Sequence, residues 1–85
     1  MILYCLIHSK IREDKLSTRI INIYHTKKES LDEFKTQKAI INRDWEIDGE
    51  IPKEYIKEKK QDSYRIHESL FNEEDYLKIE KIEIL

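Results

Sequence analysis

Glycine, proline, cysteine and valine are almost missing from this sequence, which contains one glycine, one proline, one cysteine and no valine. Because Gly49 stands alone, no glycine-rich loop is present to cradle a phosphate group. The shortage of glycine and proline also leaves no linker, so residues 1–85 are predicted to form a single domain. The lone Cys5 cannot form an internal disulfide, and nothing therefore favours an oxidising compartment.

Long hydrophobic runs are missing too. The longest, MILYCLI at residues 1–7, is too short to span a membrane. It lacks the basic segment that begins a signal peptide, and charged residues follow it closely. We therefore expect neither a membrane segment nor a signal peptide, and we expect a cytoplasmic protein. Within this run, Cys5 is predicted to be a buried, unreactive thiol.

Charge, by contrast, is abundant, because 40% of the residues are charged. Residues 1–45 carry nine Lys/Arg and six Asp/Glu, a balance of +3, and residues 46–85 carry seven and twelve, a balance of −5, which together give the net charge of −2. An acidic C-terminal half repels nucleic acid and attracts a basic protein surface. Solvated faces of an ordinary domain would have the same composition. The excess of isoleucine, lysine and glutamate indicates a source genome poor in G and C.

The clearest local signals lie in residues 17–41. Residues 19–25 are rich in β-branched and aromatic side chains and predict a strand. Thr26 follows with Glu29 three positions on, a spacing that satisfies two free backbone donors at the start of a helix. The helix is expected to end near residues 42–43 and to cover the apolar side of a sheet. The apolar residues on its inner face are Leu31, Phe34 and Ile41.

Two strands are predicted at the start of the chain. Residues 1–7 are apolar on both faces, which indicates a central strand that extends as far as Ile11. The charged turn at residues 12–15 joins it to the strand at 19–25, and a short polar connection favours an antiparallel hairpin.

Two more strands are predicted near the end, at residues 63–71 and 76–85. In the second, Leu77 and Ile79 are out of phase with the isoleucines at 82 and 84. A strict alternation cannot place all four on one face. We therefore expect either a β-bulge near residues 80–81 or a helical turn before the strand begins.

The middle segment, residues 44–61, is compatible with more than one secondary structure. Asp48-Gly49 between apolar residues favours a tight type I′ hairpin. Pro52 suits the first turn of a short second helix over residues 52–61. The predicted class is α+β: a small antiparallel sheet of three to four strands with one principal helix on a face, in the order β-β-α-(short α)-β-β. Both faces of the first strands are apolar, so we expect the second helix or another molecule to cover the second face.

Residues 44–55 also imitate a calcium-binding loop. Acidic side chains fall at loop positions one, three and five, and glycine falls at position six. Position twelve, which should be a bidentate glutamate, is Tyr55, and position nine is Pro52. These departures argue against calcium, so no metal and no cofactor is predicted.

No catalytic constellation is visible, and we expect no enzymatic activity. The serines lack a nucleophile elbow, and the acidic run at residues 73–75 is adjacent and exposed rather than tuned for acid–base catalysis. His8, His25 and His67 fall on predicted strands, but they lack the spacing of a metal site.

Nucleic acid is the alternative partner. Lys57, Lys59 and Lys60 lie close to aromatic residues, an arrangement that can bind single strands. Acidic residues at 54, 58 and 62 are interleaved with these lysines, so the local charge is nearly neutral. This alternative is a small nucleic-acid-binding regulator that uses the basic N-terminal half.

The leading prediction is a stand-alone protein-binding module that occupies a partner's surface. We expect the partner to be a host protein or a second copy of the chain, which forms a homodimer. Small size and a low-GC source are typical of phage and mobile-element accessory proteins, among them inhibitors of host defence. Trp45 is expected to extend the inner face of the helix, or, if exposed, to anchor a partner. The candidate partner-binding residues are Trp45, Tyr55, Glu73, Glu74 and Asp75.

Overall fold

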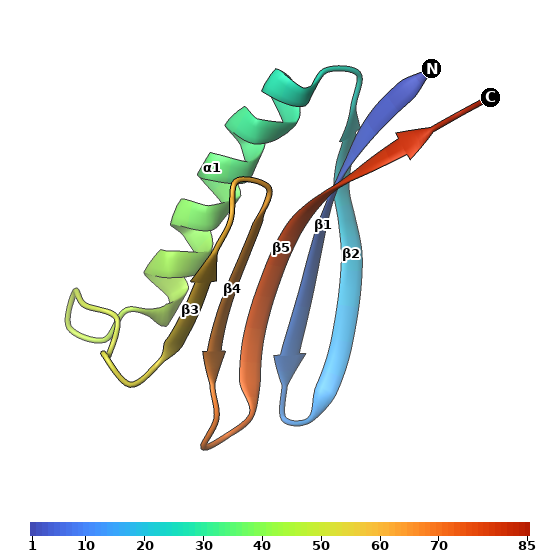
Figure 1. Ribbon diagram of the computed structural model, residues 1–85. Helices are drawn as coiled ribbons and strands as arrows, with labels where there is room; N and C mark the ends of the chain where they lie inside the picture. Colours follow the sequence, from blue (N-terminus) through green and yellow to red (C-terminus); the bar gives the residue numbers. More distant parts are fainter.

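A single helix crosses one face of a five-stranded antiparallel sheet (Figure 1). The computed structural model describes all residues, 1–85. The strands are β1 (Ile2–Arg12), β2 (Lys15–Tyr24), β3 (Ile56–Lys59), β4 (Ser63–Glu68) and β5 (Glu73–Glu83), and the helix is α1 (Lys27–Trp45). Their spatial order is β2-β1-β5-β4-β3, so the last strand of the chain lies in the middle of the sheet. The α+β class is confirmed, with one strand more than the sequence predicted.

The first hairpin is tighter and longer than expected. Arg12 pairs with Lys15, so only Glu13 and Asp14 form the turn, and both have positive φ angles (53° and 62°). These angles belong to a type I′ turn, whose twist matches that of the two strands. One extra residue of β2 then enters the ladder opposite Leu6 and Ile7, which makes a β-bulge.

Helix α1 begins as the sequence predicts. Thr26 is its N-cap, and the Thr26 hydroxyl oxygen accepts a hydrogen bond from the Glu29 backbone N–H at 3.2 Å. The Glu29 carboxylate accepts from the Thr26 hydroxyl at 2.8 Å and not from a backbone N–H, so one of the two predicted backbone bonds is formed. The helix continues two residues beyond Arg43 and ends at Trp45. The Trp45 side chain therefore lies over the sheet.

The predicted second helix at residues 52–61 is wrong. The segment turns at Pro52, whose carbonyl accepts from the Tyr55 N–H at 3.1 Å, and then forms the edge strand β3. Helices gain stability mainly from an apolar face that packs on a core, and this segment has too few apolar residues to supply one. Pairing with β4 satisfies its backbone instead.

The predicted irregularity in the last strand is also wrong. β5 pairs with β1 in unbroken register from Glu83 opposite Ile2 to Glu74 opposite Ile11. Leu77 and Ile79 face the helix, and Ile82 faces the other side. Because β5 is central, both of its faces can carry apolar residues.

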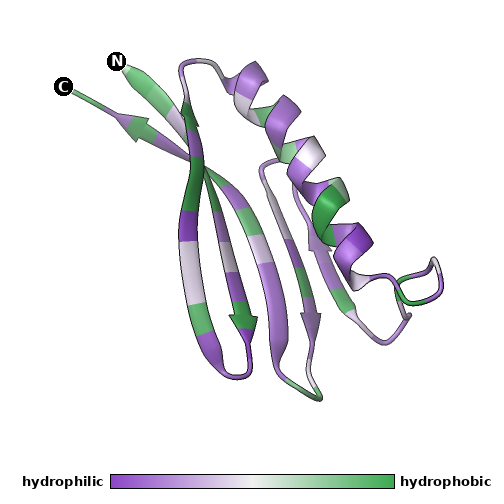
Figure 2. Ribbon diagram, turned by 180° about the vertical axis from the view of Figure 1, so that it is seen from behind, coloured by the Kyte–Doolittle hydropathy of each residue, from purple (hydrophilic) through white to green (hydrophobic).

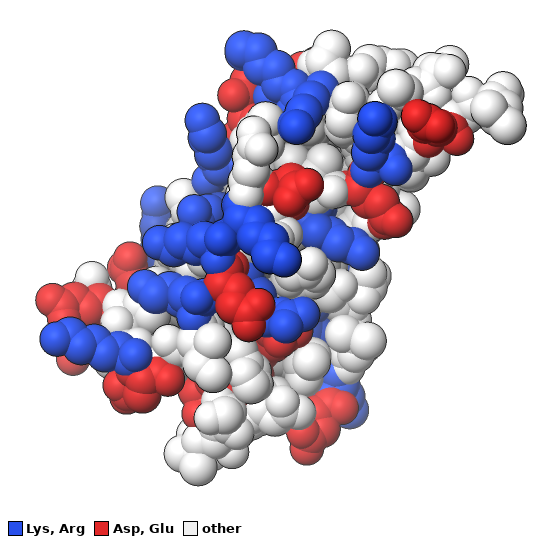
Figure 3. Space-filling view, in the orientation of Figure 1, with Lys and Arg blue, Asp and Glu red and all other residues white.

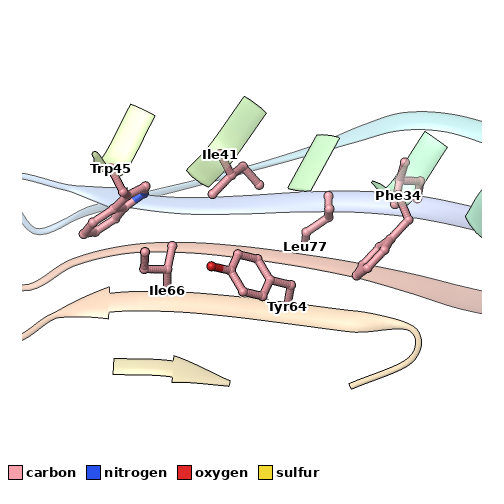
Figure 4. Packing of buried hydrophobic residues seen from close by; sticks show 7 residues of the cluster. Phe34, Ile41, Trp45, Tyr64, Ile66 and Leu77 are labelled. Carbon is pink, nitrogen blue, oxygen red and sulfur yellow. The ribbon is translucent and has the colours of Figure 1, made fainter. Parts of the chain in front are cut away.

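The core lies between α1 and the sheet (Figure 4). Phe34, Ile41 and Trp45 point from the helix toward side chains on the strands. The seven buried residues of this cluster are Leu6, Phe34, Ile41, Trp45, Tyr64, Ile66 and Leu77. The shortest dimension of the molecule is 17 Å, which is that of one sheet and one helix. No second helix covers the other face, contrary to one of the two expectations.

Candidate functional site

Asp75 is the centre of a buried polar cluster at the C-terminal end of α1. Its carboxylate accepts from His8 Nε2 at 2.7 Å, from Arg12 Nη2 at 2.6 Å and from Trp45 Nε1 at 2.5 Å. Arg12 also donates to the Glu74 carbonyl at 2.9 Å. Three segments that are distant in the sequence, β1, β5 and the end of α1, are therefore tied together by one side chain.

The environment of Asp75 keeps it ionised. Although burial raises the pKa of this carboxyl, the hydrogen bonds from His8, Trp45 and Arg12 and the charge of Arg12 outweigh burial and lower the pKa to about 2. The Arg12 guanidinium lies 5.1 Å from the centre of the Trp45 ring, so it contributes both charge and packing. A cavity of about 220 Å³ opens beside Arg12, Trp45 and Glu73.

This cluster holds β1, β5 and the end of α1 together. No serine, threonine or cysteine side chain is hydrogen-bonded to the His8 ring, whose Nε2 is occupied by Asp75. His67 faces the opposite side of the sheet, because its neighbour Ile66 is buried under the helix. No group of three or more His, Cys, Asp or Glu residues is close enough to hold a metal ion.

The candidate partner-binding residues do not form one surface. Trp45 and Asp75 are buried, at 7% and 2% exposure, so Trp45 belongs to the core as expected. Tyr55 packs edge-on against Trp45, with ring centres 5.5 Å apart. Glu74 is on the other side of the sheet, 3.3 Å from Arg65. The other four lie close together around the cavity beside Trp45, but only Tyr55 and Glu73 among them are half-buried rather than buried.

The middle segment forms a tight turn, as one of the alternatives predicted. Ile47 and Glu50 make an isolated β-bridge, with positive φ angles at Asp48 (53°) and Gly49 (83°). These angles fit a type I′ turn, in which glycine is favoured at the second position. β3 follows instead of a helix, so the helix–loop–helix frame of a calcium-binding loop is not formed.

The uncovered face of the sheet carries a continuous group of aliphatic side chains that the sequence did not place together. Opposite residues in an antiparallel pair share a face, so the pairs Ile7–Ile20 and Ile11–Leu16 both point away from the helix. Figure 2 shows hydrophobic segments of β1 and β2 side by side. We call this group the apolar stripe; its members are Leu3, Ile7, Ile11, Leu16, Ile20, Ile23 and Ile82.

Several members of the apolar stripe are strongly exposed. Leu16 is 69% exposed, Ile20 60% and Ile23 48%. The remaining half of the same face, on β4 and β5, is polar instead. There Arg65 lies 3.9 Å from Glu58 and 4.8 Å from the centre of the Tyr76 ring. An apolar patch with a charged border is the composition of a protein interface.

The two edges of the sheet also differ. β3 is a four-residue edge with alternating lysine and glutamate, a composition that discourages pairing with another chain. β2 is ten residues long and carries only two charges, Lys15 and Arg19. Its outer backbone groups have no partner strand, so β2 can accept one.

A smaller exposed patch lies in the turn between β4 and β5. Leu70 and Phe71 are 80% and 70% exposed there. The Glu68 carboxylate accepts from both of their backbone N–H groups, at 2.5 and 2.8 Å, which fixes the turn. Acidic residues line the cavity of about 320 Å³ beside it. With only two apolar side chains, this turn is a lesser candidate than the apolar stripe.

No helix of this structure combines the length and the apolar character needed to cross a membrane. Comparison of the chain with protein-family models, with curated proteins and with solved structures gave no match.

Proposed function

We propose that the protein is a cytoplasmic protein-binding module that acts by occupying a partner's surface. The observation that supports this proposal is the apolar stripe on the uncovered face of β1 and β2. Leu16, Ile20 and Ile23 would each be removed from water by a partner, and burial of an aliphatic side chain contributes about 1.5–3 kcal/mol. The partner is a host protein or a second copy of this chain.

The edge of β2 supplies specificity in this proposal. A strand of the partner that pairs with β2 gains main-chain hydrogen bonds, while side chains on alternate positions reach the apolar stripe. The module needs no chemistry of its own, because covering the partner's surface inhibits or modulates it. Small phage and mobile-element accessory proteins that inhibit host defence systems work in this manner, and the proposed role belongs to that class.

The test is site-specific photo-crosslinking in the native host. A photoreactive amino acid is placed at Leu16 or Ile20, and at Ile40 as the control, because Ile40 is an exposed isoleucine on the opposite side of the molecule. We expect one dominant protein adduct from the first two positions and none from Ile40. The partner is then purified and mixed with the chain, and Ile20→Asp is expected to abolish the complex while Ile40→Asp retains it.

Two results would contradict the proposal. One is an equal set of adducts at Leu16 and Ile40, which indicates random collision. The other is a complex that survives Ile20→Asp with unchanged affinity. An adduct with the chain itself, with a dimer in sedimentation that Ile20→Asp dissociates, identifies the second copy as the partner.

A further inference from the structure

The sheet separates charges that are interleaved in the sequence. In β3, Lys57 and Lys59 flank Glu58, and the sequence alone therefore suggests a neutral segment. Alternate residues of a strand point to opposite faces. Glu58 faces the uncovered side, where it lies 3.9 Å from Arg65, and the two lysines face the helix side.

The register of β3 against β4 places these lysines beside the core. Lys57 is opposite Ile66 and Lys59 is opposite Tyr64, and both partners are buried under α1. Since opposite residues share a face, the lysine side chains project from the sheet edge toward the helix side.

Helix α1 brings further lysines to the same side. The Lys38 ammonium group lies 5.0 Å from the centre of the Tyr64 ring, and Asn42 accepts the Tyr64 hydroxyl. Lys35 is three residues before Lys38 and therefore lies on the same side of the helix. Tyr64 thus has Lys38 over its ring and Lys59 opposite it on β3.

The acidic residues of the helix are not gathered at the lysines of its β3 side, and Asp32 already pairs with Lys28 at 3.1 Å. Burial raises the pKa of Tyr24, and the charges of Glu33 and Glu29 raise it further, which places both glutamates on the β2 side. The two glutamates are therefore kept away from the β3 side, and Asp32 borders it three residues before Lys35. Figure 3, in the view of Figure 1 with the sheet in front of the helix, shows the opposite, uncovered face, where Lys and Arg side chains are mixed with Asp and Glu.

We propose that this lysine strip, made of Lys35, Lys38, Lys57 and Lys59, binds the phosphate backbone of a nucleic acid. Ammonium groups on flexible stems bind phosphates as point charges. Lysine is depleted from protein–protein interfaces, and the strip has no exposed aromatic or aliphatic anchor, because the Tyr64 ring is buried. The contacts are therefore with phosphates and not with bases, and binding does not depend on sequence.

This inference is independent of the proposed function, because the lysine strip and the apolar stripe lie on opposite sides of the sheet. It also moves the nucleic-acid surface from the basic N-terminal half to the junction of α1 and β3. Each side can be tested with the other intact.

The test measures how salt weakens binding to DNA. The probe is a fluorescein-labelled duplex of about 20 base pairs, titrated with the whole chain by fluorescence anisotropy between about 50 and 200 mM salt. Four phosphate contacts give a slope of about −3.6 in log affinity against log salt concentration. Single changes Lys57→Gln and Lys59→Gln are each expected to reduce the slope by about one.

A matched pair of quadruple variants separates the strip from net charge. The strip variant changes Lys35, Lys38, Lys57 and Lys59 to Gln. The control variant changes Lys10, Lys15, Lys27 and Lys81 to Gln; all four are exposed and have no ion-pair partner. We expect the strip variant to lose the salt-dependent binding and the control variant to keep it. All eight lysines are outside the core, and circular dichroism verifies that both variants fold.

Three outcomes would overturn the inference. The first is the absence of binding at the lowest salt concentration. The second is an equal loss of affinity in both quadruple variants, which indicates attraction by net charge alone. The third is competition by a glutamate-rich peptide as strong as that by unlabelled DNA at equal charge, which identifies an acidic protein surface as the ligand.

Discussion

At the scale of single residues, the carboxylate of Asp75 connects three elements of the fold. It is buried and accepts from three different side chains, so its loss leaves several donors without a partner at once. An unpaired buried polar group costs about 1–3 kcal/mol, and breaking a buried ion pair costs about 3–5 kcal/mol. Arg12 is partly exposed, which reduces the second cost.

Replacing Asp75 with Asn is therefore expected to lower the free energy of unfolding by about 2–4 kcal/mol. The amide group brings two donors to a site that needs acceptors, and it removes the counter-charge of Arg12. Urea unfolding followed by the fluorescence of Trp45, the only tryptophan, measures the change. The exposed Asp44, changed to Asn in the same way, is the control and is expected to shift stability by less than about 0.5 kcal/mol. Equal effects of the two changes would contradict this role of Asp75.

Asp75 also makes the free energy of unfolding depend on pH. Its pKa is about 2 in the folded chain and 3.8 without the fold. The stabilisation is complete above pH 3.8 and is lost as the pH falls through about 2, because the folded state must then accept a proton that it binds less readily. The size of this contribution is about 2 kcal/mol.

The measurement is the free energy of unfolding between pH 5 and pH 2, in the original chain and in Asp75→Asn, with urea at each pH. Other carboxylates titrate in both proteins, so the difference between the two curves isolates Asp75. We expect this difference to shrink by about 2 kcal/mol toward pH 2. Parallel curves would show that another group causes the acid sensitivity.

At the scale of elements, the start of α1 is fixed by local chemistry. Changing Thr26 to Ala removes the acceptor for the Glu29 N–H and is expected to destabilise the chain by about 1 kcal/mol. Thr36 is the matched control, an exposed threonine in the middle of the same helix. There Thr→Ala is expected to leave stability unchanged or raise it by up to about 0.5 kcal/mol, because alanine has the higher helix propensity. Urea unfolding measures the change in stability of both variants. An equal loss of stability in both would contradict the capping role of Thr26.

The elements that the sequence predicted correctly are those fixed by neighbours in the chain. Thr26 and Glu29 are three residues apart, and their cap could be identified without the rest of the molecule. The turn at Asp48-Gly49 is equally local, because it depends on positive φ angles at two adjacent residues. The hairpin of β1 and β2 needed only a short polar connection between two apolar runs.

The elements and contacts that the sequence did not predict depend on residues that are distant in the chain. Residues 56–59 become a strand because β4 satisfies their backbone, which the sequence of that segment does not reveal. The phase of Leu77 and Ile82 suggested an irregular strand, since nothing in the sequence shows that β5 is central with two packed faces. In the sequence, Asp75 belongs to a run of acidic residues that was predicted to be exposed. The only signal of a polar cluster on the inner face was the alternation of His8 and Arg12 with apolar residues on β1.

At the scale of the whole molecule, the topology places the most distant segments of the chain side by side. β1 and β5 are neighbours in the middle of the sheet, and their paired residues are 63 to 81 positions apart, from Ile11–Glu74 to Ile2–Glu83. Residues 1 and 84 exchange two hydrogen bonds, at 2.9 and 2.7 Å. Contacts between distant residues slow folding, because the entropy of loop closure is lost before the contacts form.

A circular permutant makes these contacts local. A short glycine- and serine-rich linker joins Leu85 to Met1, and the chain is opened between Asp48 and Gly49, in an exposed turn outside the sheet. The new order, β3-β4-β5-β1-β2-α1, joins every pair of adjacent strands by a short connection. We expect the permutant to keep the fold and to refold faster by about tenfold, because its contact order is lower. Stopped-flow fluorescence of Trp45 measures the rate.

The control for the permutant is the original order carrying the same linker as a free extension after Leu85, which adds the residues without the connection. Unfolding rates of the two proteins are expected to be similar, since the folded contacts are the same. A permutant that is as stable as the control and refolds at the same rate would show that pairing of β1 with β5 is not the slow step. The rate would then be set by a step that permutation leaves unchanged, such as the packing of α1 on the completed sheet.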